Sequence, residues 1–386
     1  MVNYNRLFLS KLKELKRDTL YRDLRITKNI GTRIRINKRE AINFTSNDYL
    51  GLSIDPKVIA RTRESLQYVS QCSSRLVSGN SRSLEDLESE LATHRRTASS
   101  LVYTSGYCAI LGTLSTILDK DTVVFSDSLN HASIIDGCKL SRSEVKIFAH
   151  QNTDQLLDLI SKVNRRKILI TEGLFSIGGD LSNLKVICKI AKDFKALMIV
   201  DDAHGDFVFG RNGSGVPSHF GVDKLVDIHI SSLSKGLGCF GGYVAVDQTV
   251  RSYLINKSRQ FIYTSALPSH LCVAALTAIK IANTGKLQTR LFNNIRRMST
   301  NLKKYGFNIG ESVSQIIPII VGSEKIATGF SKLLLDKGIF VQPLRYPTVK
   351  KGHAVLRISI TAKHSLRELD AGLESIYIIG KKLNII

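Results

Sequence analysis

From residue 99 onward, short apolar runs alternate with longer segments in which apolar residues recur every three or four positions. The short runs have the length and composition of strands, and the longer segments have the period of helices with one apolar face. This alternation predicts an α/β fold with a mostly parallel sheet between helices. The predicted strands are 101–103, 122–125, 145–148, 168–170, 196–200, 227–232 and 242–246, and the predicted helices are 106–118, 131–140, 154–163 and 184–194.

Segments on both sides of this region follow other patterns. Ser83 is the predicted N-cap of a helix in which Leu84, Leu87 and Leu91 form one apolar stripe. We expect an N-terminal arm (1–45), a large domain (46–285) and a small C-terminal α+β domain (286–386). Outside the sheet region, the predicted helices are 7–20, 269–282, 287–305 and 366–383, and the predicted strands are 33–36, 316–321, 339–341 and 355–360.

Composition narrows the class of protein. A chain of 386 residues, 43% hydrophobic and 23% charged, is long enough for one large domain with a smaller one beside it. No apolar run reaches the about eighteen residues of a membrane span, and the apolar stretch at the start of the chain is too short for a signal peptide, so we expect a cytoplasmic protein without a membrane partner. The six cysteines form no Cys-x-x-Cys pair, which argues against a disulfide framework and a zinc ribbon.

The formal net charge of +22 is the unusual bulk property. Such a charge attracts phosphates, acidic proteins and nucleic acid, so a binding module for one of these is the alternative to an enzyme. Lysine and arginine are spread along the whole chain, however, without a basic tail or an aromatic-basic repeat. We therefore expect no nucleic-acid partner and interpret the charge as a background field.

Polar groups follow four of the predicted strands, and in parallel sheets ligands bind at the carboxyl ends of strands. The helix that begins at Gly106 offers free backbone N–H groups to a phosphate. Asp201 and His204 alone are compatible with metal binding or with a helix cap and a surface histidine, and without a third ligand the metal site is the weaker interpretation. The four segments are Thr104–Tyr107, Ser126–His131, Thr171–Ser176 and Asp201–Gly205.

Lys235 follows the predicted strand 227–232 and is succeeded by glycines at 236 and 238. A lysine in such a turn is most often solvated, but a partly desolvated amine has a lowered pKa and forms an imine with a carbonyl at neutral pH. Its setting favours that chemistry. A carboxylate about thirty residues earlier, a ring for stacking and a helix N-terminus for a phosphate are together what pyridoxal 5'-phosphate (PLP) requires.

These motifs resemble the α-oxoamine synthases, PLP enzymes of fold type I that join an amino acid to an acyl thioester. The resemblance covers residues from about 20 to 362. Ser74–Asn80 and Leu344–Val349 are most similar to the branch that condenses L-alanine with a pimeloyl thioester in biotin synthesis, whereas sister branches use glycine or serine with another acyl-CoA. The motifs are Ser46–Gly51, Ser128–Ser133, Glu172–Ser176, Asp201–Gly205 and Ser234–Gly236.

The resemblance implies roles for individual residues. Lys235 would hold PLP and move the Cα proton, His131 would stack on the ring and polarise the thioester, Asp201 would pair with the ring nitrogen, and His204 would bond the phenolic oxygen. Ser176 would lie near the same ring face. The phosphate would be held by Gly106, Tyr107, Ser232 and Ser234, and by Thr264 and Ser265 of the second subunit of a homodimer. The expected substrate-side residues are Arg22, Asn47, His131, Arg345, Thr348 and Arg357, with Arg357 on the carboxylate.

Two positions depart from the family pattern. Gln71–Ser74 stands where the family usually has glycines, so we expect either a different backbone course of this loop or a narrower acyl channel. Ser232 replaces the usual threonine and keeps the hydroxyl. The sequence leaves open whether CoA or an acyl carrier protein delivers the acyl group, and whether Arg22 or Arg25 faces the substrate.

Overall fold

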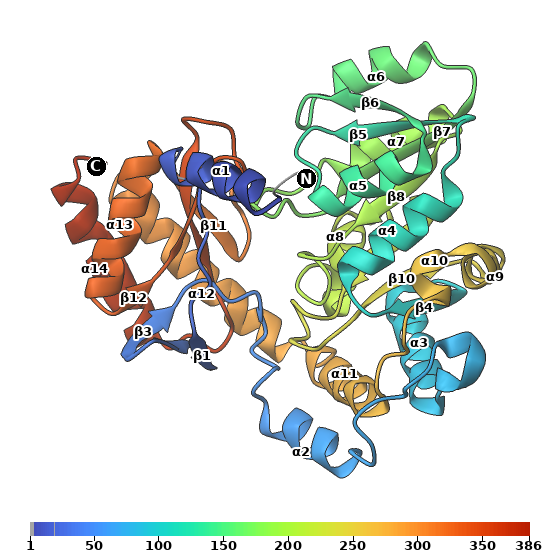
Figure 1. Ribbon diagram of the computed structural model, residues 1–386, viewed down its shortest axis with the longest axis horizontal. Helices are drawn as coiled ribbons and strands as arrows, with labels where there is room; N and C mark the ends of the chain where they lie inside the picture. The colour runs from blue at the N-terminus through green and yellow to red at the C-terminus, as the bar shows by residue number, and fades with distance from the viewer. Residues whose placement is uncertain (1–3, 19) are drawn as a thin grey trace.

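The computed structural model describes residues 4–18 and 20–386. A large sheet covered by helices lies beside a smaller α+β unit that contains the C-terminus (Figure 1). One continuous apolar core extends through both units, and a second core fills the other face of the large sheet.

Within the described residues the large sheet has the strand order β4-β10-β9-β8-β7-β5-β6. Strands β5 to β9 pair in parallel, whereas β10 is antiparallel to both β4 and β9. The predicted α/β fold with a mostly parallel sheet is therefore confirmed. The strands are β4 (Ser99–Tyr103), β5 (Thr122–Asp127), β6 (Glu144–Phe148), β7 (Arg166–Glu172), β8 (Leu197–Asp201), β9 (Ile228–Ser232) and β10 (Gly242–Val246).

Helices cover both faces of this sheet because successive strand residues point to opposite sides. Val124 belongs to the core under α4, α5, α9 and α10, while its neighbours Val123 and Phe125 belong to the core under α3, α6, α7, α8 and α11. The helices are α3 (Arg82–Arg95), α4 (Gly106–Ile117), α5 (Ala132–Ser141), α6 (Thr153–Ser161), α7 (Leu184–Asp193), α8 (Gly215–Phe220), α9 (Gln248–Lys257), α10 (Arg259–Ile262) and α11 (Ser269–Ala282).

The predicted start of α3 is wrong. The helix begins at Arg82 and its N-cap is Ser81, so Ser83 lies inside the first turn and its hydroxyl meets that of Ser81 at 3.1 Å. The predicted stripe of Leu84, Leu87 and Leu91 is nevertheless fully buried. Several helices were not predicted, namely α2 (Pro56–Glu64), α8, α9, α10 and α13 (Glu324–Asp336), as well as a π-helical turn at Arg75–Gly79.

The smaller unit contains two sheets. One has the order β11-β14-β13, and the other joins β1, β2 and β3 of the N-terminal segment to β12. Strand β3 runs parallel to β12, with Ile42 opposite Ile339. The division at residues 45 and 285 stays a proposal. The elements are β1 (Thr27–Ile30), β2 (Arg33–Ile36), β3 (Arg39–Asn43), α12 (Lys286–Lys304), β11 (Ile316–Gly322), α13, β12 (Ile339–Phe340), β13 (Gln342–Leu344), β14 (Ala354–Ser359) and α14 (Leu366–Lys382).

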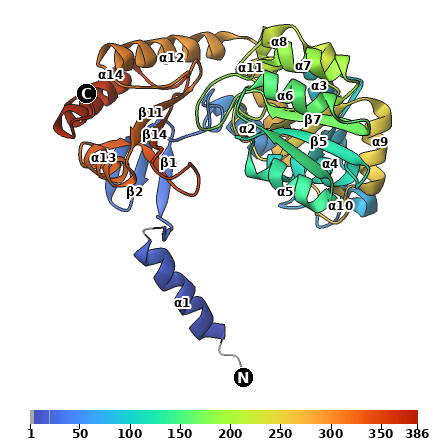
Figure 2. The same ribbon diagram turned by 90° about the horizontal axis from the view of Figure 1, so that it is seen from above.

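Helix α1 (Tyr4–Arg17) extends away from the rest of the molecule (Figure 2) and contains no buried residue. The helix predicted at 7–20 is present with other bounds, since it begins earlier and ends at Arg17, and residue 19 of the predicted range lies outside the described residues. In the part of the chain that the structure describes, no helix has the length and apolar character needed to cross a membrane.

Candidate active site

The carboxyl ends of the central strands surround a cavity with an empty volume of about 650 Å³, part of which is open to solvent. Strand β7 contributes Glu172, β8 contributes Asp201, and the segment after β9 contributes Lys235. Parallel strands bring these residues together because their carboxyl ends share one edge of the sheet. Eight predicted site residues line this cavity: Gly106, Tyr107, His131, Asp201, His204, Ser232, Ser234 and Lys235.

Lys235 begins a chain of hydrogen bonds that leads away from the cavity. Its Nζ lies 2.9 Å from His204 Nε2, and His204 Nδ1 lies 2.6 Å from the hydroxyl of Tyr49. The Tyr49 hydroxyl donates to Asn47 Oδ1 over 3.1 Å. If Lys235 donates to Nε2, then Nδ1 carries the proton, and His204 is the neutral tautomer that passes a hydrogen bond to Tyr49.

The electrostatics of the site favour neutral forms of these bases. Burial lowers the pKa of Lys235, and the carboxyl of Asp201 opposes this shift only in part. Burial also lowers the pKa of His204 well below its usual value, and the charge of Lys235 adds to the effect. A lysine with a lowered pKa has more of the free amine that attacks a carbonyl group.

Two buried carboxyls face each other at the ends of β7 and β8, where Glu172 pairs with Asp201 in the sheet register. Burial, reinforced by Asp201, raises the pKa of Glu172 well above its usual value. Burial likewise raises the pKa of Asp201, against the opposing charge of Lys235. The Oε1 atom of Glu172 has no hydrogen-bond partner among the described residues. A cation placed against Asp201 would restore its ionised form, as a protonated pyridine nitrogen does.

The N-terminus of α4 forms one wall of the cavity. The Ser105 side chain caps this helix by accepting from Cys108 N at 3.1 Å, and the first-turn N–H groups of Gly106 and Tyr107 have no helical acceptor. A Cβ atom on Gly106 would lie 2.9 Å from Ser232 Cβ, so glycine is required where helix and strand approach. With the hydroxyls of Ser232 and Ser234, which lie 2.8 Å apart, this terminus suits a phosphate.

His131 is the N-cap of α5, and its Nδ1 lies 2.7 Å from the Ser133 hydroxyl. Burial lowers the pKa of His131, so its ring is mainly neutral at neutral pH. The rings of His131 and Tyr107 meet nearly at a right angle, with centroids 6.4 Å apart. The contact with Ser133 fixes the orientation of a ring that forms part of the cavity wall.

Arg357 on β14 extends from the smaller unit toward the same hydrogen-bond chain. Its Nε donates to the Ser176 carbonyl over 2.7 Å, its Nη1 donates to Ser359 Oγ over 2.8 Å, and both Nη atoms lie 3.3 Å from Asn47 Oδ1. The structure therefore brings together three predicted residues, Asn47, Ser176 and Arg357, beside the cavity rather than in its wall.

Five other predicted residues lie outside this arrangement, namely Arg22, Thr264, Ser265, Arg345 and Thr348. Thr264 and Ser265 line a separate, small pocket next to Arg75. Arg22 is exposed in the segment before β1, and Thr348 is exposed in the turn after Arg345, whose carbonyl accepts from Thr348 N at 2.9 Å. None of these residues lines the cavity of its own chain.

From the sequence, the polar loop around Asn47 and Tyr49 is predicted either as a plain connection or as part of a pocket wall, whereas no role is predicted for Glu172. Glu172 lies two residues after the predicted strand 168–170, which was the available signal. Tyr49 is fully buried, and the 155 residues that separate it from His204 hid its contact.

A buried ion network holds the segment that carries Asp201 and His204. Arg95 donates to Asp202 Oδ2 over 2.9 Å and lies 3.0 Å from Asp206 Oδ1. Burial raises the pKa of Asp202 to about 7 against the charge of Arg95. Burial acts in the same direction on Asp206, but Arg95 and His94 outweigh it and hold the pKa of Asp206 at about 2. The network fixes the backbone on which two cavity residues stand.

These residues fit PLP. The amine of Lys235, whose pKa is lowered, suits the aldehyde, and the buried carboxyl of Asp201 suits the positively charged ring nitrogen. The N-terminus of α4, with the hydroxyls beside it, suits the phosphate. Residues 39–376 match the family model described as aminotransferase class I and II. A curated relative from Thermoanaerobacter pseudethanolicus, named 8-amino-7-oxononanoate synthase, is 39% identical over 97% of each chain.

Two solved structures are also similar. A serine palmitoyltransferase variant from S. paucimobilis, with a bound PLP-myriocin aldimine, is 27% identical and has a TM-score of 0.92 over 98% of each chain. The 8-amino-7-oxononanoate synthase of Francisella tularensis is 29% identical, with a TM-score of 0.77 over 90% of this chain and 99% of that one.

Fold and site together define a fold-type I, PLP-dependent enzyme that transfers acyl groups. The chain belongs to the aminotransferase class I and II family and, within it, to the α-oxoamine synthases.

Proposed function

We propose that the protein condenses L-alanine with a pimeloyl thioester, giving 8-amino-7-oxononanoate, carbon dioxide and a free thiol, as a step of biotin synthesis. The observation that carries this proposal is the cavity in which Lys235, Asp201 and the N-terminus of α4 meet, with Arg357 beside it. The relative from Thermoanaerobacter pseudethanolicus, which carries the name of this activity, matches along nearly the whole chain.

Each residue has a task that follows from its position. PLP, when bound, supplies an electron sink that stabilises negative charge on the amino-acid Cα. Lys235 binds the cofactor and then, as a free amine, removes and returns the Cα proton. His204 accepts a hydrogen bond from Lys235 and keeps its Nζ oriented. Asp201 holds a positive charge at the buried end of the cavity, where burial makes an unpaired carboxylate costly.

Bond making and bond breaking balance with these groups. A bond forms between Cα of alanine and the carbonyl carbon of the thioester, and the thiol departs with a proton. The alanine carboxylate then leaves as carbon dioxide, and Lys235 returns a proton to Cα. His131, in the cavity wall, donates a hydrogen bond to the thioester oxygen as negative charge develops there.

The position of Thr264 and Ser265 supports a homodimer. Both residues line a pocket of their own chain that is separate from the cavity. In the proposed dimer they reach the phosphate of the second subunit. Arg22 or Arg25, with Arg345 and Thr348, is proposed to contact the acyl substrate. The positive net charge would accelerate encounter with either CoA or an acidic acyl carrier protein in the cytoplasm.

The proposal is tested by pairing amino acids with thioesters. Purified protein with PLP is assayed for thiol release with alanine, glycine and serine, each combined with pimeloyl-CoA, pimeloyl-acyl carrier protein, acetyl-CoA and palmitoyl-CoA. We expect turnover of alanine with a pimeloyl thioester. Turnover of serine with palmitoyl-CoA, and none of alanine, would favour the sister activity that the similarity to serine palmitoyltransferase suggests.

Arg357→Lys is expected to raise the KM for alanine about 10- to 100-fold, because a lysine cannot make the paired contacts of a guanidinium with a carboxylate. The KM for the thioester is expected to change little, since that substrate does not contact Arg357 in the proposal. Steady-state kinetics with each substrate varied in turn measure both values. Arg367→Lys, an exposed arginine on α14, is the matched control. Equal KM values for alanine in Arg357→Lys and wild type would contradict the assignment.

A further inference from the structure

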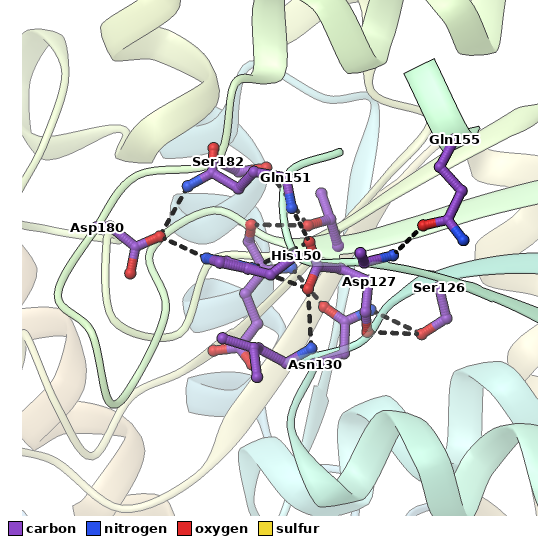
Figure 3. A network of polar contacts seen from close by, with 12 residues as sticks. Ser126, Asp127, Asn130, His150, Gln151, Gln155, Asp180 and Ser182 are labelled. Carbon is purple, nitrogen blue, oxygen red and sulfur yellow. Dashed lines mark hydrogen bonds and ion pairs between the residues drawn. The ribbon is translucent and has the colours of Figure 1, made fainter. Parts of the chain in front are cut away.

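Three loops at the carboxyl edge of the large sheet meet at His150, which follows β6. Its Nδ1 lies 3.0 Å from Asp127 Oδ1 at the end of β5, and its Nε2 lies 3.0 Å from Asp180 Oδ2 in the loop after β7 (Figure 3). A carboxylate faces each ring nitrogen, so both nitrogens donate and the ring is an imidazolium. His150 does not line the cavity.

The surroundings of the ring support its charged state. Partial burial disfavours the charge, but the hydrogen bonds to Asp127 and Asp180 outweigh this effect and raise the pKa of His150 to about 9. These two residues are the charged groups that face the ring in the described chain. Gln151 links the same pair, because its backbone N donates to Asp127 Oδ2 over 2.9 Å and its Nε2 donates to Asp180 Oδ2 over 2.8 Å.

Asp127 shapes the turn that leads to His131. Its Oδ1 accepts from Leu129 N over 2.8 Å, and its carbonyl accepts from Asn130 N over 3.1 Å. Asn130 Oδ1 in turn accepts from Glu172 N over 3.1 Å, so the turn is also fixed to the end of β7. The residue that follows this turn is the N-cap of α5 and part of the cavity wall.

Asp180 shapes the loop that orients Arg357. The Asp180 carbonyl accepts from Phe175 N over 3.0 Å. Ser176 follows Phe175 in the chain, and its carbonyl accepts from Arg357 Nε over 2.7 Å. The loop closes tightly, since a Cβ atom on Gly178 would lie 2.2 Å from Asp180 Oδ1. A displacement of Asp180 would therefore shift the main chain at Ser176, whose carbonyl orients the guanidinium of Arg357.

We propose that His150 is a positioning residue whose ring ties the His131 turn to the Ser176 loop and thereby sets the affinity for the amino-acid substrate. The inference rests on the proposed function, in which His131 and Arg357 act on opposite ends of the reacting molecule. Both residues must keep a fixed separation for the amino acid to bind in a reactive orientation, and His150 is a shared contact of the two loops that hold them.

The first measurement is the dissociation constant of L-alanine, from the change in visible absorbance of the PLP-loaded protein, for wild type and His150→Gln between pH 6 and 10. Glutamine keeps one hydrogen bond and loses the charge. We expect the dissociation constant to be about tenfold higher in the variant at pH 7.5. The ratio of variant to wild type should fall toward one as pH rises through about 9, since the wild-type ring then loses its proton.

Two further variants sharpen the comparison. Asp180→Asn keeps the size of the side chain and is expected to weaken alanine binding in the same direction at pH 7.5. His219→Gln, an exposed histidine on α8, is the matched control and should bind alanine as wild type does. In full kinetics, the KM for alanine should rise in His150→Gln while kcat stays within about twofold, which a general loss of folded protein would not produce.

Thermal unfolding across the same pH range provides a readout independent of activity. The pKa of His150 is raised on folding, so its stabilising contribution is complete below about pH 6.5 and disappears as pH rises through about 9. The difference in Tm between wild type and His150→Gln should shrink over that window. If wild type binds alanine and His150→Gln binds it with the same dissociation constant, the inference about His150 is overturned and the proposed function stands. A wild type that responds to none of alanine, glycine and serine overturns the proposed function and the inference with it.

Discussion

Replacing Lys235 with alanine is expected to lower the rate of product formation about 10⁴-fold, the upper end of what a positioned acid–base group contributes. The variant loses the amine that binds PLP and the group that moves the Cα proton. Among the described lysines, Lys235 is the one that lines the cavity, and its Nζ contacts His204. Single-turnover product formation and the visible absorbance of the PLP-loaded protein measure the two losses separately.

Lys224→Ala is the matched control. Lys224 is exposed and precedes β9, whereas Lys235 follows this strand, so Lys224 is expected to be dispensable. An excess of methylamine is expected to restore part of the rate in Lys235→Ala by supplying a free amine. A Lys235→Ala protein with wild-type absorbance and wild-type turnover would remove the basis of the proposed function.

Asp201→Asn is expected to have the second largest effect, a decrease in kcat of about 10²- to 10³-fold. The amide has nearly the shape of the carboxyl, so the loss is of charge alone. Without that charge the pyridine nitrogen is not kept protonated, and the negative charge on Cα is less well stabilised. The KM for alanine should change far less, because Asp201 lies at the buried end of the cavity and not beside Arg357.

The measurement is a pH–rate profile together with kcat and KM for both substrates. Asp121→Asn, on the exposed turn before β5, is the matched control. Asp201→Glu, which restores the charge on a longer side chain, is expected to recover part of kcat. Retention of wild-type kcat in Asp201→Asn would show that the site does not depend on a charged partner for the ring.

Elements built from local periodicity could be predicted from the sequence. The predicted ends of the strands that finish at Asp127, Glu172 and Asp201 lie within one or two residues of the observed ends. A buried parallel strand is a short apolar run, so the sequence itself shows where the run stops. Most of the cavity could be predicted for the same reason, since polar residues that follow parallel strands share one edge of the sheet.

Other elements were missed because their signals are weak or non-local. Helix α2 is a polar surface helix in which Val58 is the single buried residue, so its apolar period is faint, although Asp55 and Pro56 mark its start. The N-cap of α3 fell on Ser81 instead of Ser83 because serines at both positions satisfy the local pattern. The antiparallel direction of β10 depends on the course of the chain between 232 and 242 and not on the residues of the strand itself.

By itself the sequence determined the α/β order of elements, the apolar faces and the residues at the strand ends, because each depends on neighbours a few positions apart. Only the tertiary structure decided that Tyr49 meets His204, that Arg357 reaches Ser176, that β3 joins β12, and that His150 lies between two carboxylates. These contacts join residues from 23 positions apart, for Asp127 and His150, to 297 positions apart, for Ile42 and Ile339 (339 − 42). A periodic pattern carries information about which face of an element is buried, but not about which distant residue will lie opposite it.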